Sequence, residues 1–112
     1  MGMRTMQETT FLILTALAGG SRHGYGIVSE VEQISERRVR LRAGTLYAAL
    51  ERLSGEGLIE IEREEIVDNR LRRYYRLTPA GRERLAEEAS RLHSNARAAL
   101  TRLDPSGGMA PA

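Results

Sequence analysis

The sequence predicts a mainly α-helical fold that carries one small β-hairpin. Apolar residues recur at helical spacing in four segments, which are residues 5–19, 24–36, 43–56 and 79–103. Between the third and fourth segments, residues 58–63 and 72–77 alternate polar and apolar side chains on either side of a turn-prone stretch, 67–70. Three helices followed by a hairpin form the order of a winged helix-turn-helix domain. We therefore expect such a domain, continued by one additional helix.

The two N-terminal helices are delimited by local signals. Thr5 and Glu8 have the spacing of a capping box, in which a hydroxyl and a carboxylate satisfy free N–H groups at a helix start. The glycines that follow Ala18 end the first apolar run. The second helix is expected to begin at Gly24 and to reach about Glu36, because apolar residues recur between them at helical spacing.

The third helix and the second strand each have an apolar face. On the helix, a stripe of leucines (46, 50 and 53) leaves Ala48 and Ala49 on the other faces, where small side chains would let the helix sit deep in a groove. On the strand, successive side chains point to opposite faces. Tyr75 groups with Leu77 and is expected in the core, whereas Tyr74 is expected outside.

The last helix is expected to begin with Thr78 as its N-cap and Pro79 at its first position. Its apolar residues follow the steps of a coiled-coil seam: Leu85, Ala89, Leu92, Ala96, Ala99 and Leu103. At ~1.5 Å per residue this helix is roughly 37 Å long, more than so small a body can cover. The seam packs either on the first helix of its own chain or on a second subunit. We favour the second subunit, because a two-fold axis would also pair two recognition helices.

Positive charge is concentrated in two segments. The net charge is only +2, yet residues 37–52 carry +4 and residues 68–76 carry +3, so the remainder carries −5. These segments include the third helix and the hairpin, which are the parts that a winged helix aims at a nucleic acid. The acidic remainder would repel phosphate and so orient the molecule. The distribution therefore predicts double-stranded DNA as a partner.

The candidate DNA contacts come from the start of the second helix, from the third helix with the loop before it, and from the hairpin. They are His23, Tyr25, Arg40, Arg42, Thr45, Tyr47, Ala48, Arg52, Arg70, Arg72 and Arg73. Thr45 lies in the first turn of the third helix, where side chains reach base edges.

Several of these candidates have a structural alternative. Tyr47 lies at the edge of the leucine stripe, so it is either a DNA contact or a core residue. His23 is either the cap of the second helix or a neighbour of phosphate. The hairpin arginines either contact the DNA backbone or minor groove, as we favour for Arg70 and Arg72, or form salt bridges with the acids of the facing strand.

The composition argues against other classes of protein. The chain has no cysteine and two histidines, too few for a metal site within one chain. It shows no nucleophile with a base, no paired carboxylates and no phosphate-binding glycine loop, so we expect neither an enzyme nor a cofactor. No apolar run reaches the length of a membrane span and the first residues lack a signal sequence, so we expect a cytoplasmic protein without membrane contact.

Several motifs coincide in order with those of one known family. Residues 44–53 (GTLYAALERL), 57–59 (GLI) and 73–81 (RYYRLTPAG), preceded by 23–27 (HGYGI), resemble the PadR family of bacterial transcriptional regulators. The resemblance spans residues 8–103. It departs from the family where many members have serine in place of Arg42. This change removes a helix cap and adds a candidate contact to phosphate or guanine.

The resemblance implies a winged helix-turn-helix that represses transcription as a homodimer. It further implies that the last helix forms most of the dimer interface with help from the first helix, here from Phe11. We accordingly divide the chain into a DNA-binding domain (1–77), a dimerisation helix (78–103) and a tail (104–112) expected to be disordered from its composition.

The sequence therefore predicts a sequence-specific DNA-binding regulator, a repressor that acts as a homodimer. The alternative is a winged-helix module that binds another protein. Salt-dependent retention on DNA would separate the two, because contacts to phosphate release counterions. Some PadR relatives bind planar ligands between aromatic rings, but this chain has no tryptophan and one phenylalanine, which argues against a stacking pocket of that type. The sequence does not identify any small-molecule effector.

Overall fold

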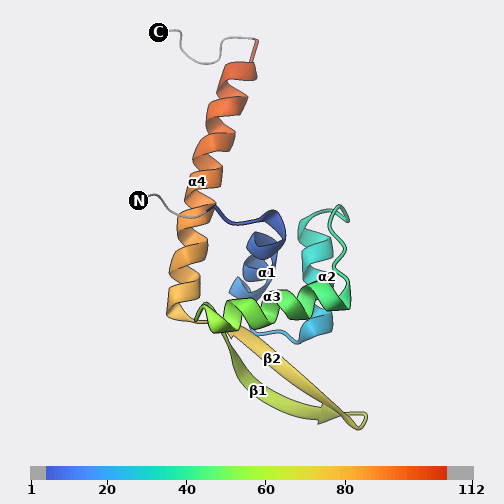
Figure 1. Ribbon diagram of the computed structural model, residues 1–112. Coiled ribbons are helices and arrows are strands. Elements are labelled where there is room, and N and C mark those ends of the chain that lie inside the picture. The colour runs from blue at the N-terminus through green and yellow to red at the C-terminus, as the bar shows by residue number, and fades with distance from the viewer. Residues whose placement is uncertain (1–4, 106–112) are drawn as a thin grey trace.

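The computed structural model describes residues 5–105, which form four helices and one antiparallel hairpin (Figure 1). In chain order the elements are α1 (Glu8–Ala18), α2 (Gly24–Ile34), α3 (Ala43–Gly55), β1 (Ile59–Val67), β2 (Arg70–Leu77) and α4 (Pro79–Leu103). The expected fold class is confirmed. Of the tail at 104–112, residues 106–112 lie outside the described part of the chain.

The helix boundaries follow local chemistry, with one correction. Thr78 caps α4 as expected, because its Oγ1 accepts a hydrogen bond from the backbone N–H of Gly81 at 3.0 Å. The capping box at the first helix was wrong. Gln7 occupies the N-cap of α1 without a side-chain hydrogen bond, so Thr5 lies too far upstream to cap it. α2 ends at Ile34, before two residues in the left-handed region, 36 and 37.

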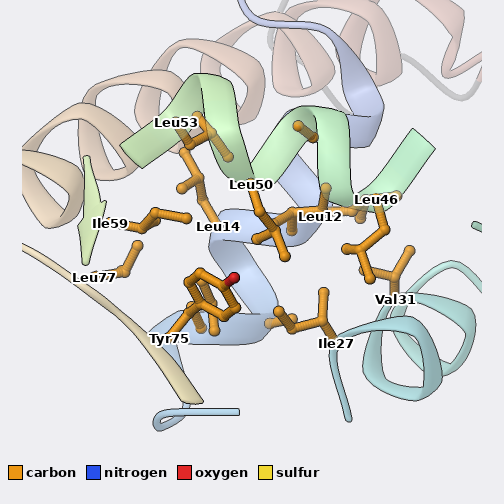
Figure 2. Close-up of a cluster of buried hydrophobic side chains, with 14 residues drawn as sticks. Leu12, Leu14, Ile27, Val31, Leu46, Leu50, Leu53, Ile59, Tyr75 and Leu77 are labelled. Carbon is orange, nitrogen blue, oxygen red and sulfur yellow. The ribbon is translucent and has the colours of Figure 1, made fainter. Parts of the chain in front are cut away.

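The hydrophobic core is built around α1, which lies between α2, α4 and the hairpin (Figure 2). Ile13 and Leu14 of α1 are fully buried, and side chains from α2, α3 and both strands complete the cluster. Tyr75 is buried here, as its strand position predicted. Ala49 is also buried, so the expectation that it faces away from the core was wrong; it lies beside Leu50 on a wider apolar stripe than the leucines alone suggested.

The hairpin ends in a tight two-residue turn and is anchored to the helices by its backbone. Asp68 and Asn69 both have positive φ, 52° and 62°, as the favoured two-residue hairpin turn requires. Along the edge of β2 that faces away from β1, Arg22 and Tyr75 exchange two backbone hydrogen bonds of 3.0 and 2.9 Å. This pairing ties the hairpin to the segment that leads into α2, so the position of the wing is fixed relative to that helix.

The two halves of α4 have different surroundings. The first half packs on the body, where Leu85 is partly buried against the core and Gly81 lies against the carbonyl group of Leu58. The second half projects away from the body, and from Leu92 onward its residues are exposed up to Leu103 (Figure 1). Within residues 5–105, none of the helices combines the length and the apolar character that crossing a membrane demands.

Candidate nucleic-acid interface

A cleft of about 630 Å³ lies between the start of α2, the first half of α3 and the tip of the hairpin. Six of the eleven residues predicted to contact DNA line it: His23, Tyr25, Tyr47, Arg70, Arg72 and Arg73. The fold therefore brings together residues from three separate segments of the sequence. We call this feature the wing cleft.

The ring of Tyr47 packs closely on a glycine in the wall of the wing cleft. A Cβ atom added at Gly24 would lie 2.7 Å from the hydroxyl oxygen of Tyr47, so a larger residue there would make this ring shift away from the start of α2. Tyr47 is 55% exposed, which rules out the alternative that it is a core residue. Tyr25 is 81% exposed. Both phenols therefore present hydrogen-bonding groups to whatever occupies the cleft.

His23 takes the N-cap position of α2 without capping the helix through its side chain. Its ring instead meets the ring of Tyr74 edge-on, with centroids 5.3 Å apart. Burial lowers the pKa of His23, and the charge of Arg72 lowers it further, against an opposing effect of Glu65. The ring is therefore neutral at neutral pH. Any attraction of this corner for phosphate comes from the open N–H groups of the first turn of α2 and from the neighbouring arginines.

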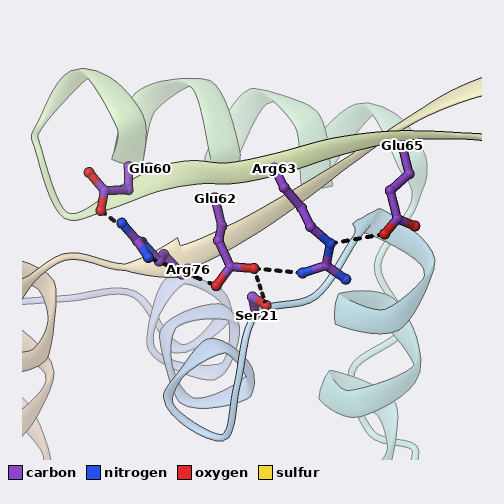
Figure 3. Close-up of polar contacts among 6 residues, drawn as sticks. All are labelled: Ser21, Glu60, Glu62, Arg63, Glu65 and Arg76. Carbon is purple, nitrogen blue, oxygen red and sulfur yellow. Dashed lines mark hydrogen bonds and ion pairs between the residues drawn. The ribbon is translucent and has the colours of Figure 1, made fainter.

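A network of charges covers one side of the hairpin (Figure 3). Arg63 contacts Glu62 at 2.6 Å and Glu65 at 3.0 Å, while Arg76 contacts Glu60 at 2.9 Å. The network also includes Ser21, whose hydroxyl group donates a hydrogen bond to the carboxylate of Glu62 at 2.8 Å. The guanidinium of Arg63 additionally stacks over the ring of Tyr74, 3.9 Å from its centroid. These contacts stiffen the hairpin, and the paired carboxylates offset the positive charge of Arg63 and Arg76.

The arginines near the tip of the hairpin differ in whether they form an ion pair. Arg73 is paired with Glu64 at 2.8 Å, so the salt-bridge alternative holds for this arginine. Within the described range 5–105, Arg70 and Arg72 make no ion pair, and both line the wing cleft. The acids of β1 thus hold Arg63, Arg73 and Arg76 in ion pairs, whereas Arg72 acts on Glu65 through its charge without such a contact.

Tyr47 is the residue of α3 that lines the cleft, and the helix has further exposed residues. Thr45 and Ala48 are exposed there, together with Glu51, a residue that the sequence analysis did not single out. Arg42 is exposed at the N-cap, and its side chain makes no capping hydrogen bond, as the missing serine predicted. Arg40 lies in the preceding loop, where it pairs with an acid of α2 at 3.6 Å.

Arg52 is separated from the other candidates. Its Nη2 donates to the hydroxyl of Thr10 in α1 at 2.8 Å, and its Nη1 lies 3.8 Å from Glu56. It lines a different cleft, between α3 and the segment that precedes α1. Helical spacing alone placed Arg52 on a polar face, but it could not tell which neighbour that face meets.

The residues predicted to form a dimer interface divide into two groups. Phe11 and Leu85 are partly buried against the core of their own chain, as the single-chain alternative implies. The others lie toward the projecting half of α4, where Leu92 is 39% and Leu103 75% exposed. Leu100, at 68% exposure, extends the same apolar face one position to the side of the seam. The strict coiled-coil spacing excluded it, although its apolar character was visible in the sequence.

Acid is expected to loosen the hairpin network. Hydrogen bonds from Ser21 to Glu62 and from Arg63 to Glu65 are the main causes that hold the pKa of each carboxylate below its ordinary value of 4.5. Such groups stabilise the fold above that value, and the contribution is lost as the pH falls through their pKa in the folded protein. Urea denaturation midpoints from neutral pH down to about pH 3 should show this loss. The fall should be shallower in Glu62→Gln, and an identical fall in the variant would contradict the assignment.

Known proteins resemble this chain over most of its length. A protein of transposon TN4556 from Streptomyces fradiae is 43% identical over 95 residues, which make up 85% of this chain but only 25% of that protein. Transcriptional regulator Rv3488 of Mycobacterium tuberculosis is 40% identical over 88 residues, 79% of this chain and 78% of that regulator. Bacillus subtilis PadR, whose structure was solved in complex with operator DNA, superposes with a TM-score of 0.64 at 26% identity, over 72% of this chain and 46% of that one.

The family assignment follows from the matched region together with these relatives. Residues 13–87 match the "Transcriptional regulator PadR-like family", a region that runs from α1 through the hairpin and into α4. It contains every element that lines the wing cleft. The chain belongs to the PadR-like family of transcriptional regulators.

Proposed function

We propose that this protein is a homodimeric repressor that binds operator DNA through the wing cleft and the exposed face of α3. The observation that carries the proposal is the position of Arg70 and Arg72, two arginines without an ion pair within residues 5–105, beside the exposed start of α3. This geometry suits a docking arrangement in which α3 lies in the major groove and the basic hairpin contacts the adjacent DNA backbone.

Each element has a distinct task in this arrangement. Thr45 and Ala48 face base edges, where a hydroxyl bonds several bases and a methyl group meets that of thymine. Glu51 offers a carboxylate, which accepts a hydrogen bond from the amino group of cytosine. The first turn of α2 and the hydroxyl of Tyr47 hold a phosphate, and the two tip arginines hold the next stretch of backbone.

The projecting half of α4 supplies the second part of the proposal. It exposes Leu92, Leu100 and Leu103 on a helix that leaves the body of its own chain. A single soluble chain gains nothing from such a stripe, whereas a second copy would cover it symmetrically. Dimerisation then places two α3 helices for two half-sites of one operator.

The relatives support DNA as the ligand. Bacillus subtilis PadR, with which this chain shares its fold, was crystallised in complex with operator DNA. This chain covers less than half of the PadR chain, so the operator and the mode of regulation of that protein are not carried over. The comparison supports the binding of a duplex by a winged helix. That this chain blocks transcription by occupying its operator is part of our own proposal.

Arg72→Ala is expected to weaken DNA binding without unfolding the protein. Loss of one phosphate contact should make the slope of log K against log salt shallower by about one. Arg97→Ala is the matched control, because this exposed arginine lies on α4, far from the wing cleft, and its removal changes the net charge equally. A fluorescence titration at several salt concentrations would measure both. Equal slopes for Arg72→Ala and the parent would reject the wing as a phosphate contact.

The operator itself is best found by selecting bound sequences from a random DNA pool. A selected inverted repeat would support the dimeric proposal, and repression of a reporter carrying that repeat would support the repressor. If no sequence is enriched and retention on DNA does not depend on salt, the alternative of a protein-binding winged helix is favoured instead.

A further inference from the structure

Glu88 of α4 is a buried carboxylate, whereas the other charged side chains of residues 5–105 are exposed or partly exposed. Its side chain is 1% exposed, and among residues 5–105 it is the only charged residue in the buried set. The DNA-binding surface does not include it, and it lies beside the apolar seam of α4 rather than on it. A buried charge in such a small domain requires compensation by specific partners.

The partners of Glu88 come from α4 and from the segment that precedes α1. Arg91 donates to both carboxylate oxygens, from Nε at 3.3 Å and from Nη2, and Nη1 of Arg84 lies 3.8 Å away. The backbone N–H of Met6 also donates to the carboxylate. The hydrogen bond from Arg91 is the main cause that keeps the pKa of Glu88 below its ordinary value, so the group is ionised at neutral pH. The carboxylate thus bridges the long helix to the N-terminal segment of the body.

Glu88 lies where α4 leaves the body. Leu85, one turn earlier, still packs on the core, and Leu92, one turn later, begins the exposed half. From Glu88 to Leu103 the helix extends about 22 Å. A swing of about 10° at this point would therefore move the far end by about 4 Å, which is close to the rise of one base pair of DNA, about 3.4 Å.

We propose that Glu88 is a positioning residue that fixes the angle of α4 on the winged helix and thereby sets the spacing of the operator half-sites that the dimer accepts. The proposal rests on the proposed function above. Its physical basis is directional. An apolar contact tolerates sliding, whereas this buried carboxylate, already paired with Arg91 on its own helix, meets a donor from outside α4 only when the backbone N–H of Met6 converges on it.

The first experiment measures the angle without DNA. The chain has no cysteine, so Gln33→Cys on α2 and Ser94→Cys on α4 would carry one spin label each. Diluting labelled chains with unlabelled ones isolates the distance within a single chain. Glu88→Gln should broaden that distance distribution, whereas Glu87→Gln, an exposed neighbour, should leave it unchanged. An unchanged distribution in Glu88→Gln would overturn the proposal, even if the protein did not bind DNA.

The second experiment measures half-site spacing. Duplexes carry the selected half-site as an inverted repeat, with spacers lengthened or shortened by single base pairs. The parent should prefer one spacing. The measured quantity is the affinity for the preferred spacing divided by the affinity for a spacing one base pair longer or shorter. We expect Glu88→Gln to lower this ratio about fivefold, which is the lower end of the range for coupling between distant sites. Ile27→Val, which weakens the core without touching α4, should keep the preference.

The outcomes separate a positioning role from a purely stabilising one. If Glu88→Gln loses stability but keeps the spacing preference of the parent, Glu88 only stabilises the fold and the proposal fails. If Glu88→Gln does not fold, Glu88→Asp replaces it, because aspartate keeps the charge but, being one methylene shorter, draws the carboxylate back from the backbone N–H of Met6. The same broadening and loss of spacing preference are then expected. A parent that binds no DNA would refute the proposed function, while the spin-label result would still decide the role of Glu88.

Discussion

Leu100→Glu is expected to convert the dimer to a monomer and to lower operator affinity by about two orders of magnitude or more, since linking two sites is worth roughly 10²- to 10⁴-fold. Leu100 is 68% exposed in the single chain, so the variant should fold normally. Across a two-fold interface the substitution would bury two carboxylates, each costing several kcal/mol unless it is paired. Sedimentation equilibrium and a DNA titration would measure the two effects.

Thr101→Glu is the matched control for this change. Thr101 is exposed and adjacent, but it lies off the apolar stripe, on another side of α4. It should leave both the assembly state and the affinity close to those of the parent. If Leu100→Glu still sediments as a dimer, or if the parent is already a monomer, the projecting half of α4 is not the interface and the dimeric proposal fails.

Gly81→Ala is expected to destabilise the fold by about 3 kcal/mol, although alanine favours helices over glycine by up to about 1 kcal/mol. A Cβ atom at this position would lie 1.9 Å from the carbonyl oxygen of Leu58 and 2.9 Å from its carbon. The same oxygen accepts a hydrogen bond from the backbone N–H of Thr78 at 3.1 Å, so it cannot move away without breaking this contact. The junction between the hairpin and α4 must therefore open.

Gly55→Ala provides the opposite result within the same protein. This residue ends α3, and a Cβ atom there meets no heavy atom within 4 Å. The substitution should be neutral or should stabilise the protein by up to about 1 kcal/mol. Chemical denaturation of both variants tests the comparison. If Gly81→Ala were as stable as Gly55→Ala, the close approach of α4 to Leu58 would not exist in solution.

Local patterns were sufficient for much of the fold because they report short-range physics. The turn at residues 68 and 69 was visible from residue types that tolerate positive φ, and the burial of Tyr75 followed from strand alternation. The alternation fails in β1, where a bulge between Ile61 and Arg63 changes the register. Ile61 faces Tyr75, whereas Arg63 faces Tyr74, so the charge network of the hairpin could not be read from a period of two.

The candidate site was predictable in composition but not in pairing. The sequence identified the arginines of the wing, yet only the fold shows that Arg73 is paired with Glu64 while Arg72 is not. Likewise Arg52 and Thr45 shared a polar helix face, and packing of α3 on α1 directs Arg52 toward Thr10. Long-range neighbours decide these outcomes, and helical or strand periodicity carries no information about them.

As the proposed dimer interface, the apolar stripe on the projecting half of α4 would make operator occupancy rise more steeply than in proportion to gene dosage. A chain without a partner exposes Leu92, Leu100 and Leu103, and it presents only one α3 helix to the operator. At low abundance, the population of paired chains grows with the square of the number of chains, because assembly follows mass action. Under the proposed function, a modest change in synthesis or degradation would therefore move the operator from mostly vacant to mostly occupied.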